Sequence, residues 1–272
     1  MLSAFWCHLL SAIKLYLLGL KVLLLQLLNG PLRLPVMPRQ DGNVAIVTGG
    51  GRGIGYEVAR HLVRLGAHVI IAENVITSMK EDVLLFLEFK KLDLASLQSV
   101  RQFAQSFRER DLPLNILVNN AGVMLVPEGR TEDGFEQHFG VNYLGHFLLT
   151  WLLLDTLKDS GKSGHVSRVV NVSSSAHCIG QIRLNDLNSR QSYSSHAAYC
   201  QSKLAQVLFS FHLHQEMQSG GFQVSSCAVD PGMVDTALYR HLWTPLHRAQ
   251  SVIARLLFRV KHGSAFSVVS QL

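Results

Sequence analysis

A strand that ends in a glycine-rich turn is the feature that most constrains how this chain can fold. The apolar run at residues 44–47 predicts a buried strand, residues 48–55 read TGGGRGIG, and an amphipathic helical pattern continues to about Leu65. Strand, glycine turn and helix in this order are typical of dinucleotide binding, because the helix start offers unpaired N–H groups and a positive dipole end to a phosphate. A purely structural turn is the alternative.

The glycines of the turn have separate tasks in that interpretation. Gly49 permits the tight turn, Gly53 lets the backbone approach a pyrophosphate, and Gly55 lets helix and strand pack closely. The candidate cofactor contacts of the turn are Thr48, Gly49, Arg52, Gly53, Ile54 and Gly55.

Strand and helix patterns then alternate along the chain. Further strands are expected at residues 68–72, 87–92, 115–118, 168–172 and 224–229, and further helices at 78–85, 96–108, from about Thr131, and at 195–217. This order predicts an α/β fold with a Rossmann-type, doubly wound parallel sheet. Helices would cover both faces, and a ligand would bind at the carboxyl edge of the strands.

Residues after the second and third strands bear on the choice of cofactor. Glu73 follows the second strand, where an acidic residue usually hydrogen-bonds the ribose hydroxyls of NAD. Arg52, inside the glycine turn, could instead reach the 2'-phosphate of NADP. The sequence therefore predicts NAD or NADP, with a slight preference for NAD. Asp93 follows the third strand and could either touch the adenine ring or cap a surface turn.

Tyr199 and Lys203 stand four residues apart in the predicted helix at 195–217. At this spacing both side chains leave the same face, one turn apart. The ammonium of Lys203 can then stabilise the phenolate of Tyr199, which makes the phenol a usable base near neutral pH. Taken alone, the pair could also belong to an amphipathic helix with a solvated lysine.

The first 28 residues are dominated by leucine. No small-x-small cleavage site precedes Pro31. Lys14 and Lys21 are seven apart, lie on one helical face, and could snorkel while the leucines enter lipid. We expect an uncleaved membrane anchor at residues 1–28, spanning or interfacial, with membrane lipid as its partner. A cleaved signal peptide and a soluble packing helix are the alternatives.

Composition limits the remaining organisation. Residues 29–42 contain three prolines and predict a linker, followed by one NAD(P)-binding domain at 43–272. The net charge is +6, but the basic residues are scattered, which argues against nucleic acid. Because of the leucine-rich N-terminal segment, attraction to an anionic membrane surface fits this charge better. The four cysteines have no disulfide or metal spacing, so we expect a reducing compartment and no metal site.

Several motifs stand in the order found in the short-chain dehydrogenase/reductase family, which the sequence resembles over about residues 44–236. They are Thr48-Gly49-x-x-x-Gly53-x-Gly55, Asn119-Asn120-Ala121-Gly122, Asn142, Ser174, Tyr199-x-x-x-Lys203 and Pro231-Gly232. Residues 142–147, 170–174 and 198–205 resemble the membrane-associated retinol dehydrogenase branch of that family.

The resemblance implies a role for each catalytic residue. Tyr199 would be the general acid/base, and Lys203 would stabilise its phenolate and hold the nicotinamide ribose. Ser174, the second serine after its strand, would hydrogen-bond the substrate oxygen. Asn142 would support a water-linked proton relay behind Lys203, although a backbone-bonded amide is the usual role of such a residue taken by itself. The further cofactor contacts implied are Asp93, Asn119, Ala121, Gly122, Pro231, Gly232, Val234 and Thr236.

The implied activity is an NAD(P)-dependent oxidoreductase. It would interconvert a lipophilic alcohol, of retinoid, steroid, polyprenol or dolichol type, and its aldehyde or ketone by hydride transfer. Residues 242–260 would cover the substrate as an amphipathic segment or simply pack on the core. The implied location is a membrane of the endoplasmic reticulum or a lipid droplet, with secretion as the alternative, and homodimer formation is left open.

Two departures from the family pattern bear on activity. The chain between Ala72 and Asp93 is several residues shorter than in the relatives. The segment 261–272 does not supply the helix and seventh strand that usually border the substrate site, so we expect a sheet without its usual last strand. The alternative function is therefore a catalytically impaired, truncated isoform that only binds cofactor or a partner. A sugar-nucleotide epimerase is disfavoured by the glycine spacing.

Overall fold

The structure, a computed structural model, describes residues 2–29, 37–74, 86–161, 164–232 and Val268. Several expectations lie wholly or partly outside the described residues. They are the linker at 29–42, the helix at 78–85, the cofactor contacts Val234 and Thr236, the covering segment at 242–260, and the lack of a last strand at 261–272.

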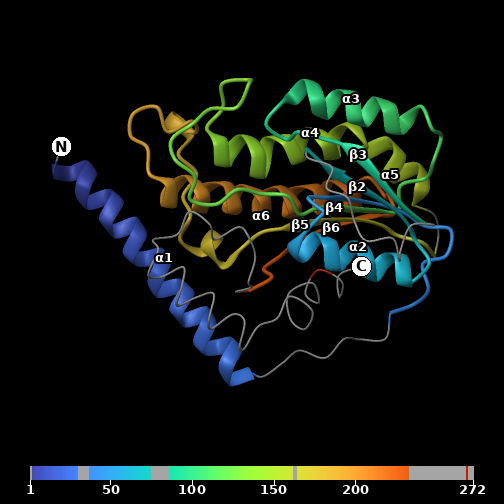
Figure 1. The fold of residues 1–272 in the computed structure, drawn as a ribbon, viewed down its shortest axis with the longest axis horizontal. Coiled ribbons are helices and arrows are strands. Elements are labelled where there is room, and N and C mark those ends of the chain that lie inside the picture. Colours follow the sequence, from blue (N-terminus) through green and yellow to red (C-terminus); the bar gives the residue numbers. More distant parts are fainter. Residues whose placement is uncertain (1, 30–36, 75–85, 162–163, 233–267, 269–272) are drawn as a thin grey trace.

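Six parallel strands form the central sheet, in the order β3-β2-β1-β4-β5-β6 (Figure 1). All neighbouring pairs run parallel. This confirms the α/β fold class with a Rossmann-type parallel sheet. The strands are β1 (Val44–Thr48), β2 (His68–Glu73), β3 (Leu87–Lys91), β4 (Ile116–Asn119), β5 (Ser167–Val172) and β6 (Val224–Val229).

Helices lie on both faces of the sheet (Figure 1). Alternate residues of β1 divide between the two apolar cores: Val44 and Ile46 pack on the side of α3 to α6, whereas Ala45 and Val47 pack on the side of α2. A strand covered on both faces must be apolar at every position, which explains the unbroken apolar run. The helices are α2 (Gly53–Arg64), α3 (Leu97–Arg108), α4 (Gly145–Leu152), α5 (Leu154–Ser160) and α6 (Ser195–Ser219).

The order of the strands locates the ligand site. The chain progresses outward from β1 through β2 to β3, and then returns to pair β4 with the other side of β1. At this switch point the turns after β1 and β4 diverge, and ligands bind in the crevice outside these strand ends in open α/β sheets. The glycine turn and the Asn119-Asn120-Ala121-Gly122 turn are those two connections.

One expected helix begins later than the sequence pattern indicated. Residues 131–135 form a turn instead of a helix, in which the Thr131 hydroxyl accepts a hydrogen bond from the Phe135 N–H at 3.2 Å. Gly134 has φ +81°, a left-handed value that no α-helix accommodates. Helical hydrogen bonding starts after Glu136, passes through a π-helix at Phe139–Leu144 and continues as α4.

The leucine-rich start is a helix, α1 (Leu2–Asn29), that crosses one end of the domain beside α6 (Figure 1). It contacts the first part of α6 and the 3-10 helix η3 (Ser175–Ile179). Within the described ranges, no helix combines the length and apolarity that crossing a bilayer requires.

Candidate active site

The glycine turn after β1 has a backbone that only glycine adopts easily. Gly49 and Gly53 have φ values of +63° and +59°. A Cβ at Gly55 would lie 2.5 Å from the carbonyl oxygen of Gly49, so any side chain there would push the turn away from α2. The Asn120 amide, from the turn after β4, donates to the carbonyls of Thr48 (2.9 Å) and Gly49 (3.2 Å). The two turns therefore hold each other in place.

The helix that follows the turn leaves its first N–H groups available. Arg52 occupies the N-cap of α2 but makes no side-chain capping hydrogen bond there. In most helices a Ser, Thr, Asp or Asn side chain satisfies one of these groups. An uncapped helix start beside a glycine turn fits the pyrophosphate of a dinucleotide, since both the N–H groups and the helix dipole favour an anion.

Thr48 links the two turns to a buried histidine. Its hydroxyl oxygen accepts from the backbone N–H groups of Asn120 (2.9 Å) and Ala121 (3.0 Å), and lies 2.9 Å from Nε2 of His146. The Nδ1 atom of His146 lies 2.9 Å from the carbonyl of Asn142. A carbonyl can only accept, so Nδ1 carries the proton and Nε2 accepts from Thr48. His146 is therefore a neutral connector.

Electrostatics support the neutral form of this imidazole. Burial, with a smaller contribution from the charge of Lys203, lowers the pKa of His146 to about 4, although the hydrogen bond to the Asn142 carbonyl opposes the shift. His146 is almost fully buried, at 1% exposure. Protonation would leave two donors facing Thr48 and the Asn142 carbonyl, and would break the link to the glycine turn.

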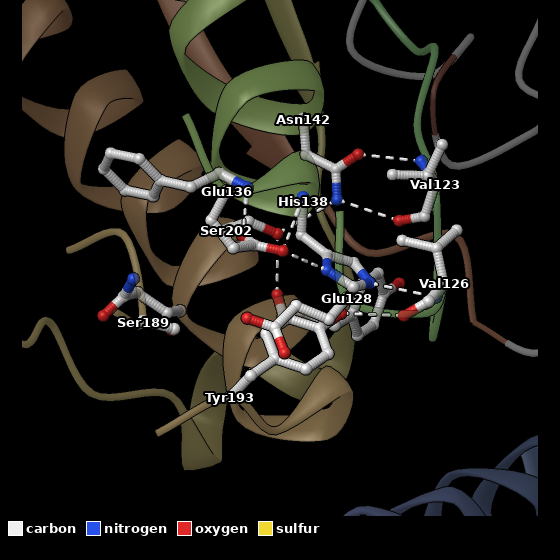
Figure 2. A network of polar contacts seen from close by, with 12 residues as sticks. Val123, Val126, Glu128, Glu136, His138, Asn142, Ser189, Tyr193 and Ser202 are labelled. Carbon is white, nitrogen blue, oxygen red and sulfur yellow. Dashed lines mark hydrogen bonds and ion pairs between the residues drawn. The ribbon is translucent and has the colours of Figure 1, made fainter. Parts of the chain in front are cut away.

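Asn142 clamps the turn after β4 to helix α6 (Figure 2). Its oxygen accepts from the Val123 N–H at 2.8 Å, and its amide nitrogen donates to the Val123 carbonyl at 3.0 Å and to the Ser202 hydroxyl at 3.0 Å. Ser202 in turn donates to the carbonyl of Tyr199 at 2.7 Å. Gly122 lies against this clamp, since a Cβ there would be 3.1 Å from the Asn142 oxygen. Asn142 is thus a backbone-bonded amide here, and its role in a proton relay stays a prediction.

Tyr199 and Lys203 come together as the helical spacing predicts. Helix α6 begins after Ser194, whose hydroxyl accepts from the Ala197 N–H at 3.4 Å, and this places Tyr199 in the second turn. Both functional side chains are buried, at 3% and 4% exposure, and the Lys203 Nζ lies 5.9 Å from the centre of the Tyr199 ring.

The ammonium of Lys203 is held from the sheet side. It donates to the carbonyl of Val172, at the end of β5, at 2.8 Å and to Oε1 of Gln206 at 2.9 Å. Burial lowers the pKa of Lys203 to about 7, although the carboxylate of Asp230 raises it. A lysine with such a pKa can exchange a proton near neutral pH.

Three consecutive serines follow β5, and the structure separates their roles. The hydroxyl of Ser173 donates to the carbonyl of Lys203 at 2.9 Å, and that of Ser175 donates to the carboxylate of Asp230. The hydroxyl of Ser174 accepts from the Ala176 N–H at 3.3 Å, as the N-cap of η3. Among the contacts of the described residues, Ser174 thus uses its oxygen only as an acceptor, and its proton can be given to a substrate oxygen.

The two conflicting signals for the cofactor lie in contact. Oε2 of Glu73 accepts from the Gly51 N–H at 2.8 Å, and Oε1 lies 4.0 Å from Nε of Arg52. The Arg52 side chain is 71% exposed, whereas that of Glu73 is 14% exposed. Glu73 therefore forms part of the floor of the glycine turn, and Arg52 stands at its rim.

The remaining candidates for cofactor binding differ in how far they are buried. The Asn119 amide is fully buried and donates to Thr150 (3.0 Å) and Asn171 (2.9 Å), so its side chain braces the sheet. Asp93 accepts from the Ala95 N–H at 2.8 Å and from Asn74 at 2.7 Å, which caps the end of β3. Residues half-buried at the strand edge are Ile54, Ala121, Gly122, Pro231 and Gly232.

The buried carboxylate of Glu136 and the buried imidazole of His138 were not identified from the sequence (Figure 2). Glu136 accepts from the backbone N–H groups of His138 (2.9 Å) and Phe139 (2.8 Å), and from Nδ1 of His138 at 2.7 Å. Burial alone would raise the pKa of Glu136, but the hydrogen bonds from His138 and the backbone outweigh it and lower the pKa. An acidic residue just before a helical pattern is a capping signal that could have revealed it.

This buried pair also reaches the loop after β4. Nε2 of His138 accepts from the Val126 N–H at 3.3 Å, and Tyr193 donates to the Val126 carbonyl at 2.7 Å. The rings of His138 and Tyr199 meet edge to face, with centres 6.1 Å apart. The pair therefore fixes both the loop and one side of the Tyr199 ring. No local sequence pattern predicts that Val126, Tyr193 and Tyr199 contact this pair.

Comparisons with known proteins agree with this geometry. The sequence model of the family described as short chain dehydrogenase matches residues 43–246. The chain is 55% identical over 268 residues to the polyprenol dehydrogenase of Danio rerio, which covers 96% of this chain and 83% of that protein. It is 47% identical over 212 residues to retinol dehydrogenase 12 of Homo sapiens, and this match covers 74% of this chain and 64% of that protein.

Solved structures show the same fold. The RhlG/NADP active-site complex of Pseudomonas aeruginosa superimposes with a TM-score of 0.62 at 25% identity, and the match covers 85% of this chain and 91% of that one.

The neutral state of His146 predicts a pH dependence of stability. The unfolded chain takes up a proton near pH 6.5 and the folded chain only near pH 4, so stability falls as pH drops through this window. The shift corresponds to roughly 3 kcal/mol of unfolding free energy. We expect His146→Gln, which keeps a donor and an acceptor, to flatten this part of the curve in urea unfolding between pH 4 and 7. The exposed His165, changed to Gln, is the control, and an unchanged slope in His146→Gln would contradict the assignment.

Proposed function

The chain belongs to the short chain dehydrogenase family, and we propose that it interconverts a long lipophilic alcohol of the polyprenol class and its carbonyl product. The family and the relatives named polyprenol and retinol dehydrogenase make it an oxidoreductase that uses a nicotinamide cofactor. The observation that supports the proposed chemistry is the meeting of Tyr199, Lys203 and the serines after β5 at the sheet edge that carries the glycine turn.

The chain's own residues would divide the reaction into two transfers. A nicotinamide cofactor bound at the glycine turn would supply the acceptor or the donor for the hydride of the carbinol carbon. Tyr199 takes the hydroxyl proton of the alcohol, and gives it back in the reverse direction. The Ser174 hydroxyl holds the substrate oxygen, and the buried ammonium of Lys203 stabilises the Tyr199 phenolate whenever the proton is on the alcohol. The glycine turn and the start of α2 hold the pyrophosphate.

A substitution at Tyr199 tests the acid/base assignment. Phenylalanine keeps the ring that packs on His138 but cannot carry the proton, so Tyr199→Phe should lower kcat by about 10²- to 10⁴-fold. The affinity for NADH, measured by fluorescence, should stay within a few-fold. Tyr143→Phe in the π-helix is the matched control and should keep its activity. The assignment fails if Tyr199→Phe turns over as fast as the wild type. Cofactor binding without turnover in the wild type would instead favour the impaired isoform.

The carboxylate of Glu73, which accepts from the Gly51 N–H beneath the glycine turn, is the basis of a proposed preference for NAD. A 2'-phosphate placed near the ribose corner would meet the carboxylate of Glu73, whereas the hydroxyls of NAD can donate to it. The exposed Arg52 acts in the opposite sense, because it can pair with the phosphate. We propose that the carboxylate dominates because it is the less exposed of the two and is fixed by the Gly51 N–H.

Paired variants measure this preference. Glu73→Gln keeps an oxygen for the Gly51 N–H but removes the charge, so the ratio of kcat/KM for NAD over NADP should fall by about tenfold. Arg52→Ala should raise the same ratio, because NADP loses its cation. Glu57→Gln in α2, where the carboxylate pairs with Arg60, is the control and should leave the ratio unchanged. A ratio insensitive to both Glu73 and Arg52 would rule out this corner as the selector.

We also propose that α1 attaches the protein to a membrane surface, of the endoplasmic reticulum or a lipid droplet, by lying along it. The outward side of α1 carries exposed apolar side chains and two exposed lysines. Such a face can enter the headgroup region while the lysines meet anionic lipid. These side chains are Leu9, Leu10, Ile13, Lys14, Leu17, Leu20, Lys21, Leu24, Leu25 and Leu28.

Vesicle flotation tests this attachment. The full chain should float with phosphatidylcholine vesicles, and more strongly when phosphatidylserine is added. Leu17→Asp with Leu24→Asp should abolish flotation, because two charges would have to enter the apolar layer. Leu184→Asp on the short helix η4 (Leu184–Asp186), also an exposed leucine, should have no effect. Equal flotation of the double variant and the wild type would refute the attachment.

A further inference from the structure

The inward side of α1 lies beside the proposed acid/base. Leu15 packs against the cluster that contains Tyr199 and Cys200 of α6, and α1 contacts both α6 and η3 (Figure 1). The N-terminal helix is therefore in the immediate surroundings of the reacting group, in addition to presenting leucines outward.

A ring contact fixes α1 at this place. The rings of Tyr16 and His196 meet edge to face with centres 5.7 Å apart, and the Tyr16 hydroxyl lies 3.4 Å from Nε2 of His196. His196 stands three residues before Tyr199 in α6, so the contact and the phenol lie one helical turn apart. Tyr16 is half-buried at this contact, and burial raises the pKa of its hydroxyl.

The surroundings of Tyr199 on this side are apolar. Met124 and Leu125 from the loop after β4 and Ala176 from η3 are buried against Tyr199 and Cys200. Burial keeps the Cys200 thiol neutral, since it raises its pKa to about 12. Leu15 of α1 and Ile179 of η3 cover this cluster from outside, half-buried. An apolar layer next to a proton-transfer group suits a hydrocarbon chain attached to the reacting carbon.

We propose that α1 forms a wall of the substrate site, in which Leu15 and Tyr16 contact the hydrocarbon chain next to the carbinol carbon. This rests on the proposed function as a dehydrogenase of lipophilic alcohols. Because the opposite side of α1 carries exposed leucines, a long substrate follows one helix from lipid to Tyr199 without passing through water.

The proposal separates long substrates from short ones. Leu15→Ala removes wall area that only a long chain reaches. We expect the KM for a long-chain polyprenol in detergent micelles to rise about fivefold, with kcat unchanged. For the water-soluble five-carbon alcohol prenol, both constants should match those of the wild type. Leu184→Ala on η4, an exposed leucine outside α1, is the control and should change the constants for neither substrate.

The outcomes distinguish this inference from the proposed function. If the wild type oxidises no alcohol, the proposed function fails. If the wild type is active but Leu15→Ala keeps the wild-type KM for both alcohols, as Leu184→Ala does, the wall is refuted and the function stands. An equal loss of kcat for both alcohols in Leu15→Ala would also overturn the proposal, since α1 would then only support the fold around Tyr199.

Photolabelling of the wild-type full chain gives a readout that no folding defect can affect. With NADH bound, a prenyl alcohol carrying a diazirine near its hydroxyl should label Leu15 or Tyr16, and excess unlabelled polyprenol should suppress that label. Labelling of outward residues such as Leu17 by probe dissolved in the micelle should not be suppressed. Competition-sensitive label found only outside α1 would contradict the wall.

Discussion

The hydrogen bond between the Thr48 hydroxyl and the buried imidazole of His146 is the interaction on which the rest of the site depends. It lies at the switch point of the sheet, where the turn after β1 and the turn after β4 must stay in register to hold a dinucleotide. From His146 the polar contacts continue through the Asn142 carbonyl and side chain to Ser202 and then to the backbone of Tyr199. One chain of buried hydrogen bonds thus couples the cofactor turn to the acid/base helix. Each link is costly to leave unpaired in the interior.

Much of this architecture could be predicted from the sequence because it depends on short-range patterns. The central strand β1 contains an unbroken apolar run, the glycine turn is a local backbone requirement, and Tyr199 and Lys203 stand at a helical spacing. The links between these parts depend on contacts that no spacing reveals. Thr48 and His146 are 98 residues apart, and the helix expected from Thr131 starts later because Gly134 takes a left-handed conformation.

The turn residues Glu73 and Arg52 show why two local sequence signals for a cofactor can disagree. Glu73 and Arg52 each match a rule for a different cofactor, because each rule treats one side chain as acting alone. In the structure Nε of Arg52 lies 4.0 Å from Oε1 of Glu73, so the two charges partly offset each other. The net electrostatic effect on a ligand depends on which of the two side chains is more solvated. The less exposed carboxylate also accepts the Gly51 N–H, which orders it before any ligand arrives. Sequence rules identified the two residues but could not weigh them.

The leucine-rich helix was difficult to interpret for another reason, because apolar residues occur on all of its sides. Both sides of α1 are apolar, so periodicity cannot tell the side that packs on the domain from the side that does not. The structure separates them: Leu15 and Tyr16 face η3 and α6, whereas Leu10, Leu17 and Leu24 are exposed on the other side. A helix that is apolar all round is stable only if each side has an apolar neighbour. If the protein core and the hydrocarbon substrate cover one side of α1, lipid is the simplest apolar neighbour for the exposed leucines on the other side.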